Sequence, residues 1–509
     1  MNRRQILQAA TFGGPSYWAI GCAQAADTRA AASSETPPPA LSRNSPLSAR
    51  DLRSDLALLD RIYRDMHPGL ARYQTHHQWH DAVAALDASW AARSEHRLDA
   101  AYLELSRLLA RVRCGHSYAN FYNQRRTVVQ ALFEGRDKLP LTFVWLGQRM
   151  VVTGGALRAG TEVLAIDGVP VAQLLARLMP LVRSDGHNDA KRRALLSVDA
   201  REGFETFDIF HALTAAARER FVLDVREPGT GPRRVELQAI DLNQRRAMNP
   251  RKPAPPSDEA PPWTLSYDTE RNAVLTMPGW ALYNSKWDWA GWLDRKLDEV
   301  VEMRAPRLLV DLRRNEGGLD CGDAILARCI DRPLLVRAEE RLVRYRRVAD
   351  ELNPVLDTWD NGFRDWGDRV QPVADRPGFF RVVPSDGSAE AGGKTIEPRG
   401  PRFAGELRVL TSSTNSSATF RFVSLVREHA LGRTIGGTTG GNQRGINGGA
   451  FFFVRLPGTG LEVDLPLIGY YPRGPLRPDA GLEPDLVVTE TIEDIAEGHD
   501  RVLEVASRA

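Results

Sequence analysis

Apolar residues recur at helical spacing over the first folded part of the chain. They stand three or four positions apart, which places their side chains on one face of an α-helix. The runs that keep this spacing are Leu52 to Met66, Trp79 to Trp90 and Tyr102 to Val112. Pro68–Gly69 follows the first run and Cys114–Gly115 follows the third, and Pro and Gly commonly end helices. The pattern predicts an N-terminal helical domain over residues 48–125.

From about residue 139 the pattern changes to short β-rich runs. β-branched and aromatic residues are frequent in them, as is usual in strands. The clearest runs are Leu141 to Trp145, Met150 to Thr153 and Gly160 to Gly168. We expect a small β-containing domain over residues 139–240. A Pro-rich, charged stretch over 241–262 then favours a linker.

A strand–helix–strand pattern follows this linker. Ala273–Met277 and Leu308–Leu312 are apolar strands, and an apolar stripe predicts a helix near Ser285–Met303 between them. The second strand is a nearly continuous apolar run, which is typical of a strand buried on both faces. We therefore expect a βαβ unit with parallel strands.

The same pattern occurs again nearer the C-terminus. After a long mixed insertion at 333–403, the strand Leu407–Leu410 leads through a polar turn to a helix near Ser417–His429. We expect an α/β core with a mostly parallel sheet over residues 263–490. Residues 491–509 are expected to form a C-terminal tail.

The N-terminus predicts export. Arg3 and Arg4 form a pair, a weakly apolar stretch runs from Ile6 to Ile20, and Ala23–Ala25 offers a small-residue cleavage site. We assign residues 1–25 as an export signal. The paired arginines resemble a twin-arginine signal, which carries folded proteins across the membrane.

Export implies a periplasmic or cell-envelope location. Ala19–Cys22 loosely resembles a lipoprotein box, so Cys22 is a candidate site for a lipid anchor. Residues 26–47 are rich in Ala, Ser and Pro, which favours a flexible linker between this segment and the first folded unit.

Composition narrows the classes of function. Of 509 residues, 42% are hydrophobic and 26% are charged, which is enough for buried cores. The 67 Lys and Arg residues against 65 Asp and Glu leave a net charge of +2, so we expect no nucleic-acid partner. The four cysteines include no Cys-x-x-Cys pair, and Gly436–Gly441 lacks the lysine of a phosphate loop. We expect no metal and no cofactor.

Two polar loops follow the predicted strands of the α/β core. They are Arg313–Gly318 and Thr411–Ser417. Open parallel sheets bind ligands at the carboxyl ends of their strands. The second loop places hydroxyls at the start of a helix, where free N–H groups and the helix dipole stabilise developing negative charge. The loops indicate a nucleophile and an oxyanion hole, although Ser, Thr and Asn before a helix are also common N-caps.

A serine nucleophile needs a base, which is usually a lysine or a histidine. The chain has six lysines and none lies beyond Lys394, so no lysine follows the second loop. Most of the histidines stand among polar or charged neighbours. His116 differs, because it stands just past a predicted helix in Arg113–Ser117 and precedes an apolar, aromatic run.

Four segments resemble, in their order, the C-terminal processing, or tail-specific, serine peptidase family. They are Leu309–Gly318, Thr414–Ala418, Ile435–Gly441 and Gly481–Asp485. Upstream, Cys114–Ser117 resembles that family's Asp-Gly-His-Thr segment, and Gly160–Val169 resembles part of a PDZ-like domain in a degenerate form. The resemblance implies a crotonase or ClpP-like α/β core, an N-terminal helical bundle and a PDZ-like β domain over 139–240.

The resemblance also implies roles for single residues. Ser416 matches the nucleophile, because it stands three positions before the residue that is usually Glu and here is Thr419. Ser417 is the alternative nucleophile. The lysine of the tail-processing branch would fall at Gly441 or Asn442, so its Ser-Lys pair is missing here.

This departure resembles the tricorn-core-like branch, which uses a Ser-His pair instead. His116 is then the implied base. The implied acid is Asp479, with Glu483 as the alternative. Backbone N–H groups of Gly318 and Ser417 are the implied oxyanion hole.

The expected function is a serine-type peptidase that hydrolyses peptides or proteins in the cell envelope through an acyl-enzyme on Ser416. The missing lysine and glutamate leave a second hypothesis, a non-catalytic relative on the same fold that binds a peptide or a hydrophobic ligand. In a third, the PDZ-like part binds peptides as an envelope scaffold, without turnover.

Overall fold

The computed structural model describes residues 41–508 except for 202, 216–217, 250–255, 284, 338 and 384–392. The expected export signal, residues 26–40 of the expected linker, and Cys22 lie outside the described residues. Within the described part, every helix is too short or too polar to cross a bilayer.

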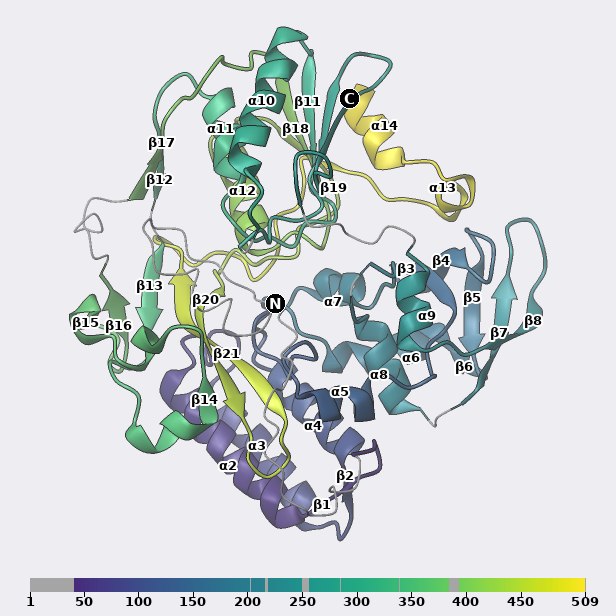
Figure 1. The fold of residues 1–509 in the computed structure, drawn as a ribbon, viewed down its shortest axis with the longest axis vertical. Coiled ribbons are helices and arrows are strands. Elements are labelled where there is room, and N and C mark those ends of the chain that lie inside the picture. Colours follow the sequence, from purple (N-terminus) through teal and green to yellow (C-terminus); the bar gives the residue numbers. More distant parts are fainter. Residues whose placement is uncertain are drawn as a thin grey trace.

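The first unit consists of packed helices (Figure 1). The three expected helices are α2 (Ala49–Met66), α3 (His76–Ala91) and α4 (Leu98–Ala110), and a further helix is α5 (Arg126–Leu132). A short antiparallel pair of strands, β1 (Pro46–Leu47) and β2 (His96–Arg97), precedes α2 and α4. The Ser48 side chain caps α2, and Thr75 with Gln78 forms a capping box at α3, so the sequence itself fixes both helix starts.

The second unit is a six-stranded antiparallel sheet with helices on it. Its order is β3 (Leu141–Leu146), β4 (Arg149–Gly155), β5 (Glu162–Ile166), β7 (Arg220–Arg226) and β8 (Arg233–Gln238), and β6 (Val169–Pro170) also pairs with β5. Its helices are α6 (Val171–Leu178), η1 (Met179–Leu181), α7 (Asp189–Leu195) and α8 (Thr206–Thr214). The expected linker 241–262 begins with another helix, α9 (Leu242–Ala247), which is pinned by a buried Arg245–Asp208 ion pair of 2.7 Å.

The third unit is a mixed six-stranded sheet. Its order is β22 (Leu486–Val487), β19 (Arg433–Gly436), β18 (Glu406–Thr411), β11 (Arg307–Asp311), β10 (Ala273–Thr276) and β9 (Thr264–Tyr267). All neighbours are parallel except β9, which is antiparallel to β10. The expected βαβ unit is β10, α10 (Trp289–Glu302) and β11.

Helices cover both faces of this sheet (Figure 1). Helices α10, α11 (Gly322–Cys329) and α12 (Ser417–Glu428) bury their apolar residues on one face. The other face packs against α14 (Arg501–Arg508), which follows the short α13 (Ile492–Glu497). Residues 491–509, expected as a tail, therefore contain a helix that belongs to the fold.

A second six-stranded sheet is antiparallel and lies beside the N-terminal helices (Figure 1). Its order is β14 (Leu356–Asp357), β20 (Asn447–Arg455), β21 (Glu462–Tyr471), β13 (Glu340–Val343), β16 (Phe380–Val382) and β15 (Val370–Pro372). The insertion also holds the strand pair β12 (Leu334–Arg337) and β17 (Gly393–Ile396), and the short helices η2 (Asp350–Val355), η3 (Asn361–Arg364) and η4 (Gly367–Arg369). The region expected as one core over 263–490 thus divides between two sheets.

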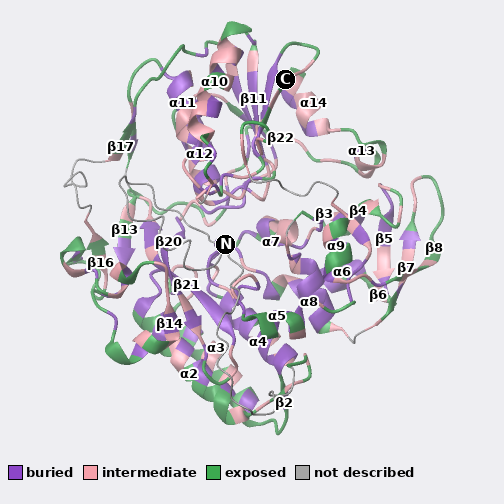
Figure 2. Ribbon diagram, in the orientation of Figure 1, coloured by how far each residue is buried: buried purple, intermediate pink, exposed green. Residues whose placement is uncertain are grey.

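The long hairpin of β20 and β21 is buried along most of its length (Figure 2). One hydrophobic cluster joins it to α2, α4 and the sheet of the second unit. A separate cluster lies under α10, α11 and α12. The N-terminal helices therefore hold the β20–β21 hairpin, which comes from more than 300 positions later in the chain.

Candidate active site

The two polar loops do meet at the carboxyl edge of the parallel sheet. Strands β11 and β18 are neighbours, with Asp311 opposite Leu410, so the loops that leave them start side by side. The buried Asn415 amide donates to the carbonyl of Asn315, at 3.0 Å, and to that of Leu312. This amide fixes the second loop against the first.

Ser416 stands at the N-cap position of α12, but its side chain makes no capping hydrogen bond. Its Oγ instead donates to the backbone carbonyl of Glu316, at 3.1 Å, and lies 3.4 Å from Nζ of Lys191. The residue is 4% exposed. The hydroxyl is therefore held toward the first loop and is not used to start the helix.

The backbone on both sides of Ser416 has unusual conformations. Gly317 and Gly318 have φ values of +125° and +139°, and Ser417 has φ of +54°. A Cβ on Gly317 would lie 2.8 Å from the carbonyl oxygen of Ser416, so only glycine permits this close approach.

The backbone N–H groups of Gly318 and Ser417 are available as hydrogen-bond donors where the two loops meet. Ser417 is the first residue of α12, and the first N–H groups of a helix have no carbonyl partner one turn earlier. Among the described residues, the Gly318 N–H donates no backbone hydrogen bond. Two free donors beside a serine are what an oxyanion hole requires.

Three charged side chains form a cluster next to Ser416, with Lys191 and Arg183 from the second unit and Glu316 from the loop after β11. Lys191 is 1% exposed, and its Nζ lies 2.6 Å from Oε1 of Glu316. Arg183 contacts the same carboxylate at 3.2 Å. Although burial raises the pKa of Glu316, the two cations hold that pKa well below its usual range. Burial lowers the pKa of Lys191, and Glu316 opposes that effect.

His116 lies in the same charged neighbourhood. It is 8% exposed, and its Nδ1 has no hydrogen-bond partner among the described residues. Burial lowers its pKa while the nearby Asp185 raises it, so the neutral imidazole is favoured. Its loop is fixed because Asp185 accepts from the Gly115 N–H at 2.9 Å and Arg183 donates to the Gly115 carbonyl at 2.8 Å.

Asp479 is bound to a different histidine from the one expected. Its Oδ2 lies 2.6 Å from Nδ1 of His187, and its Oδ1 accepts from Asn442 at 2.7 Å. Within the described part of the chain, no hydrogen bond joins Asp479 to His116. The alternative acid, Glu483, offers its backbone carbonyl to Arg427.

The structure brings Ser416, Gly318 and Ser417 together and places His116 near the charges that surround Ser416. One segment next to this site was not predicted from the sequence. It supplies Arg183, Asp185, His187 and Lys191. One signal was available, because Lys191 is one of only six lysines and stands in a short run dense in charge. Because Lys191 precedes Ser416 by 225 positions, no local spacing links the two residues.

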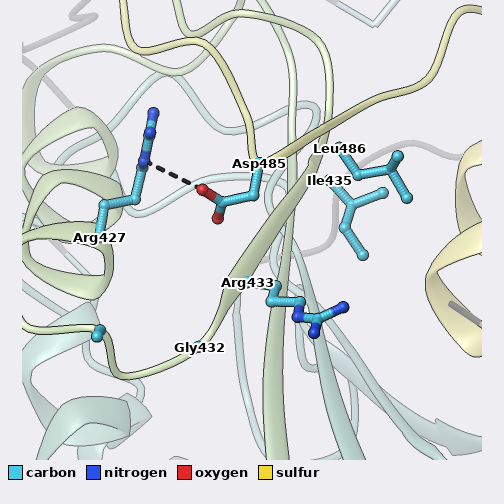
Figure 3. A pocket seen from close by; sticks show the side chains of 7 residues that line it. Arg427, Gly432, Arg433, Ile435, Asp485 and Leu486 are labelled. Carbon is cyan, nitrogen blue, oxygen red and sulfur yellow. Dashed lines mark ion pairs between the residues drawn. The ribbon is translucent and has the colours of Figure 1, made fainter.

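Two other features lie away from this site. A surface hollow of about 440 Å³ is lined by Arg427, Arg433 and Asp485 (Figure 3), at the opposite end of α12 from Ser416. On α3, the exposed side chains of His77, His80 and Asp81 lie close enough to hold an ion, far along the chain from the two loops at Ser416. Neither feature adds to the site around Ser416.

Comparison with known proteins agrees with this architecture. Residues 271–488 match the model of peptidase family S41. A structure of mature CPAF complexed with lactacystin superposes with a TM-score of 0.59 at 15% identity, covering 90% of this chain and 97% of that chain. A second structure of mature CPAF gives 0.56 at 16% identity, covering 90% and 96%. No curated protein matches the sequence. The chain therefore has the fold of S41 peptidases.

Proposed function

We propose that the chain is a serine-type peptidase that forms an acyl-enzyme on Ser416. One observation carries the proposal: the buried Ser416 hydroxyl at the start of α12 is not used as a cap and is held instead against the glycine-containing loop, through the Glu316 carbonyl. Both Ser416 and Gly318 belong to the part that matches the S41 model. A peptide or a protein is the substrate that such a site fits.

The proposed reaction uses His116 as the base. The imidazole takes the proton of the Ser416 hydroxyl while Oγ bonds to the peptide carbonyl carbon. The N–H groups of Gly318 and Ser417 hold the oxyanion. His116 then gives its proton to the leaving amine, and water hydrolyses the acyl-enzyme. Before the reaction, the neutral His116, whose Nδ1 has no partner within the described part of the chain, can accept a proton.

Asp479 has a positioning role in this proposal. Its carboxylate accepts from the backbone N–H of His187 at 3.0 Å as well as contacting the ring. Through these contacts and Asn442 it ties the segment that carries Lys191 to the α/β core. Removal of Asp479 would therefore loosen this segment next to the site.

The cell envelope is the proposed location of this activity. The support comes from the paired Arg3 and Arg4 and from the small residues around Ala25. Cys22 stays the proposed point of attachment for a lipid.

One observation favours the alternative of a non-catalytic relative that binds a peptide or a hydrophobic ligand. The carboxylate expected to orient His116 is bound to His187 instead, and the Nδ1 of His116 lacks a partner among the described residues. A histidine without an orienting group is a weaker base than one within a connected triad. Binding without turnover would leave Ser416 unreactive.

The test is labelling of the purified, signal-less protein with a fluorophosphonate probe, mapped by peptide mass spectrometry. We expect the probe on Ser416, no labelling of Ser416→Ala, and labelling of Ser417→Gly at a rate close to that of the unchanged chain. Ser417→Gly is the matched control, because it removes the neighbouring hydroxyl and glycine suits the positive φ.

The base is tested in the same assay with His116→Ala. We expect its labelling rate to fall by about 100-fold or more, as for the loss of a general base. A folded protein whose Ser416 is never labelled would support the binding alternative. Labelling of Ser416 at an unchanged rate in His116→Ala would remove His116 from the mechanism.

A further inference from the structure

Lys191 reaches Ser416 from a separate unit of the fold. It lies on α7 and stands 225 positions before the serine. Its aliphatic chain passes directly over Gly440, where an added Cβ would lie 2.9 Å from Lys191 Cδ. Asn188 caps α7 and donates to the carbonyls of Thr439, at 2.8 Å, and Gly441, at 3.0 Å. These contacts dock α7 so that its lysine enters the site.

The contacts of Lys191 match those of a protonated amine. An ammonium group has three N–H donors, and a neutral amine has two. Three acceptors lie within reach of Nζ: Oε1 of Glu316 at 2.6 Å, the Thr414 carbonyl at 3.1 Å and Oγ of Ser416 at 3.4 Å. Because the side chain is 1% exposed, these protein atoms take the place of water around the charge.

The serine hydroxyl already uses its own proton elsewhere. Its O–H donates to the Glu316 carbonyl, so its oxygen is the acceptor toward Lys191. A cation next to that oxygen stabilises the negative charge that develops there when the proton leaves, and a buried site strengthens this effect. Glu316 thus holds the serine through its carbonyl and the lysine through its carboxylate.

We propose that Lys191 is a further catalytic residue, a cation that contacts Ser416 Oγ throughout the reaction and stabilises the charge that develops on it. The inference rests on the proposed function of Ser416. In the acylation step the Oγ–H bond breaks, the proton moves to His116, and the Oγ electron pair forms the bond to the carbonyl carbon. The C=O π pair moves onto the carbonyl oxygen. Lys191 keeps its proton.

This role predicts a specific dependence of the labelling rate of Ser416 on pH. Four titratable or charged groups face Lys191 from the elements around it: Glu316, Arg183, Asp185 and His116. Because the charged lysine is the active form, the labelling rate must fall at high pH as Lys191 loses its proton. A lysine acting as the general base would give the opposite result, a rate that rises as the proton is lost.

The experiment compares fluorophosphonate labelling of Ser416 in the unchanged chain, Lys191→Met and Arg193→Met. Arg193→Met is the matched control, because it removes a cation of the same helix that is not among its buried residues and that, among the described residues, contacts neither Ser416 nor Glu316. We expect Lys191→Met to react at least about 100-fold more slowly, as for the loss of one electrostatic donor, and the control to react normally. Near-UV circular dichroism checks that each variant is folded.

A second variant keeps the test valid if Lys191→Met does not fold. Glu316→Gln changes a side chain that is 40% exposed and removes the carboxylate that keeps Lys191 charged. We expect the high-pH fall in labelling rate to move to lower pH in this variant. If the labelling rate of Glu316→Gln instead rises in the alkaline range, where His116 is already neutral, the lysine is a base and the proposed role is wrong.

The outcomes separate the two proposals. If the unchanged chain is not labelled on Ser416, the proposed function itself fails. If it is labelled and Lys191→Met is labelled equally fast, the function stands and only the role of Lys191 is overturned. Labelling that depends on Lys191 and falls at high pH supports both.

Discussion

At the scale of single residues, the conformation of Ser417 is the clearest sign of a constrained site. Its φ of +54° lies in the left-handed region, which costs a serine about 1 kcal/mol. The close approach of Gly317 fixes this backbone, because Ser417 Cβ would lie 2.9 Å from any Cβ on that glycine. The left-handed Ser417 begins α12 directly after the extended Ser416.

Substitutions of Ser417 should therefore change the stability of the fold, and the direction of the change should depend on the new side chain. Ser417→Gly should raise the free energy of unfolding by about 0.5–1 kcal/mol, because glycine adopts positive φ without strain. Ser417→Val should lower it by about 1–3 kcal/mol, since a β-branched residue rarely adopts this region. Urea unfolding measures both. Equal stability of the two variants would show that the strain is not stored at this residue.

Ser416 could be predicted from the sequence because its neighbours form a local motif. The role of its hydroxyl could not, since a serine before a helix is commonly a cap. Whether Oγ caps α12 or faces Glu316 depends on the backbone angles of Ser417 and Gly317, which the sequence does not report.

At the scale of elements, periodic apolar patterns located the longer helices and buried strands well. Helices α2, α3 and α4 lie where the spacing placed them, as do strands β10, β11 and β18. Helix α14 was not predicted. It has eight residues, of which Val502 and Ala506 are buried, and so short a helix gives no clear repeat of apolar positions. Its position on the sheet depends on packing between parts of the chain that are distant in sequence.

Helix α14 should contribute measurably to stability. Val502 is 5% exposed and packs against the face of the sheet opposite α12, and the Ala506 carbonyl accepts from the buried Arg408 at 2.6 Å. Val502→Ala should lower the free energy of unfolding by about 1–3 kcal/mol through lost packing. Arg508→Ala, on the exposed side of the same helix, is the control and should change little. Thermal unfolding of both variants decides whether residues 491–509 act as a tail.

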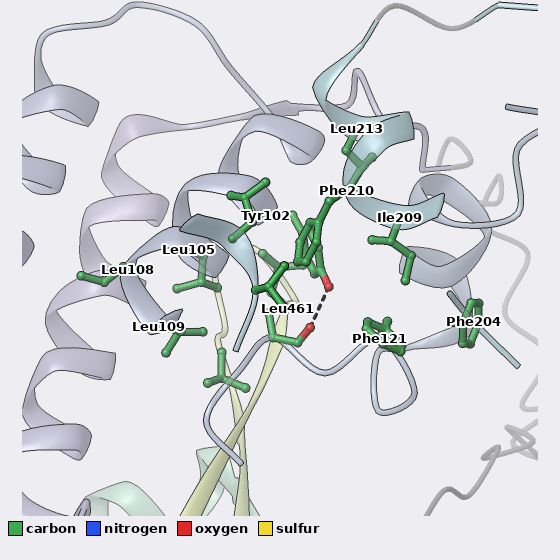
Figure 4. Close-up of a cluster of buried hydrophobic side chains, with 14 of the residues drawn as sticks. Tyr102, Leu105, Leu108, Leu109, Phe121, Phe204, Ile209, Phe210, Leu213 and Leu461 are labelled. Carbon is green, nitrogen blue, oxygen red and sulfur yellow. Dashed lines mark hydrogen bonds between the residues drawn. The ribbon is translucent and has the colours of Figure 1, made fainter. Parts of the chain in front are cut away.

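At the scale of the whole molecule, the candidate site exists only when separate units are folded against each other. His116 lies between α4 and α5 of the first unit, Lys191 belongs to the second unit, and Ser416 stands at the start of α12 in the α/β unit. A shared core holds the first two units together: Figure 4 shows Tyr102 of α4, Phe210 of α8 and Leu461 beside β21 in one cluster. Contacts over 225 or more positions have no local pattern, which is why the sequence did not reveal them.

The chain also contains a buried acid that links its distant parts. Asp464 of β21 accepts from Asn120 at 2.7 Å and Asn123 at 2.8 Å, just after His116 in the chain. Burial raises the pKa of Asp464 to about 7, although both amides oppose this and Glu462 adds to it. In the unfolded chain an aspartate titrates near pH 4, as model peptides do. Between these values the folded protein binds the extra proton.

Stability should therefore fall as the pH rises from about 4 to about 7, because the folded state must then lose a proton that the unfolded state has already lost. Asp464→Asn removes this titration, so the melting temperature of the unchanged chain should drop relative to that of Asp464→Asn between pH 5 and pH 8. Asp331→Asn, which changes a carboxylate that is 68% exposed, is the control and should follow the unchanged chain. A constant difference between Asp464→Asn and the unchanged chain over this range would show that Asp464 is ionised throughout. The loop that carries His116 would then be held to β21 by a charged carboxylate at every pH in the range.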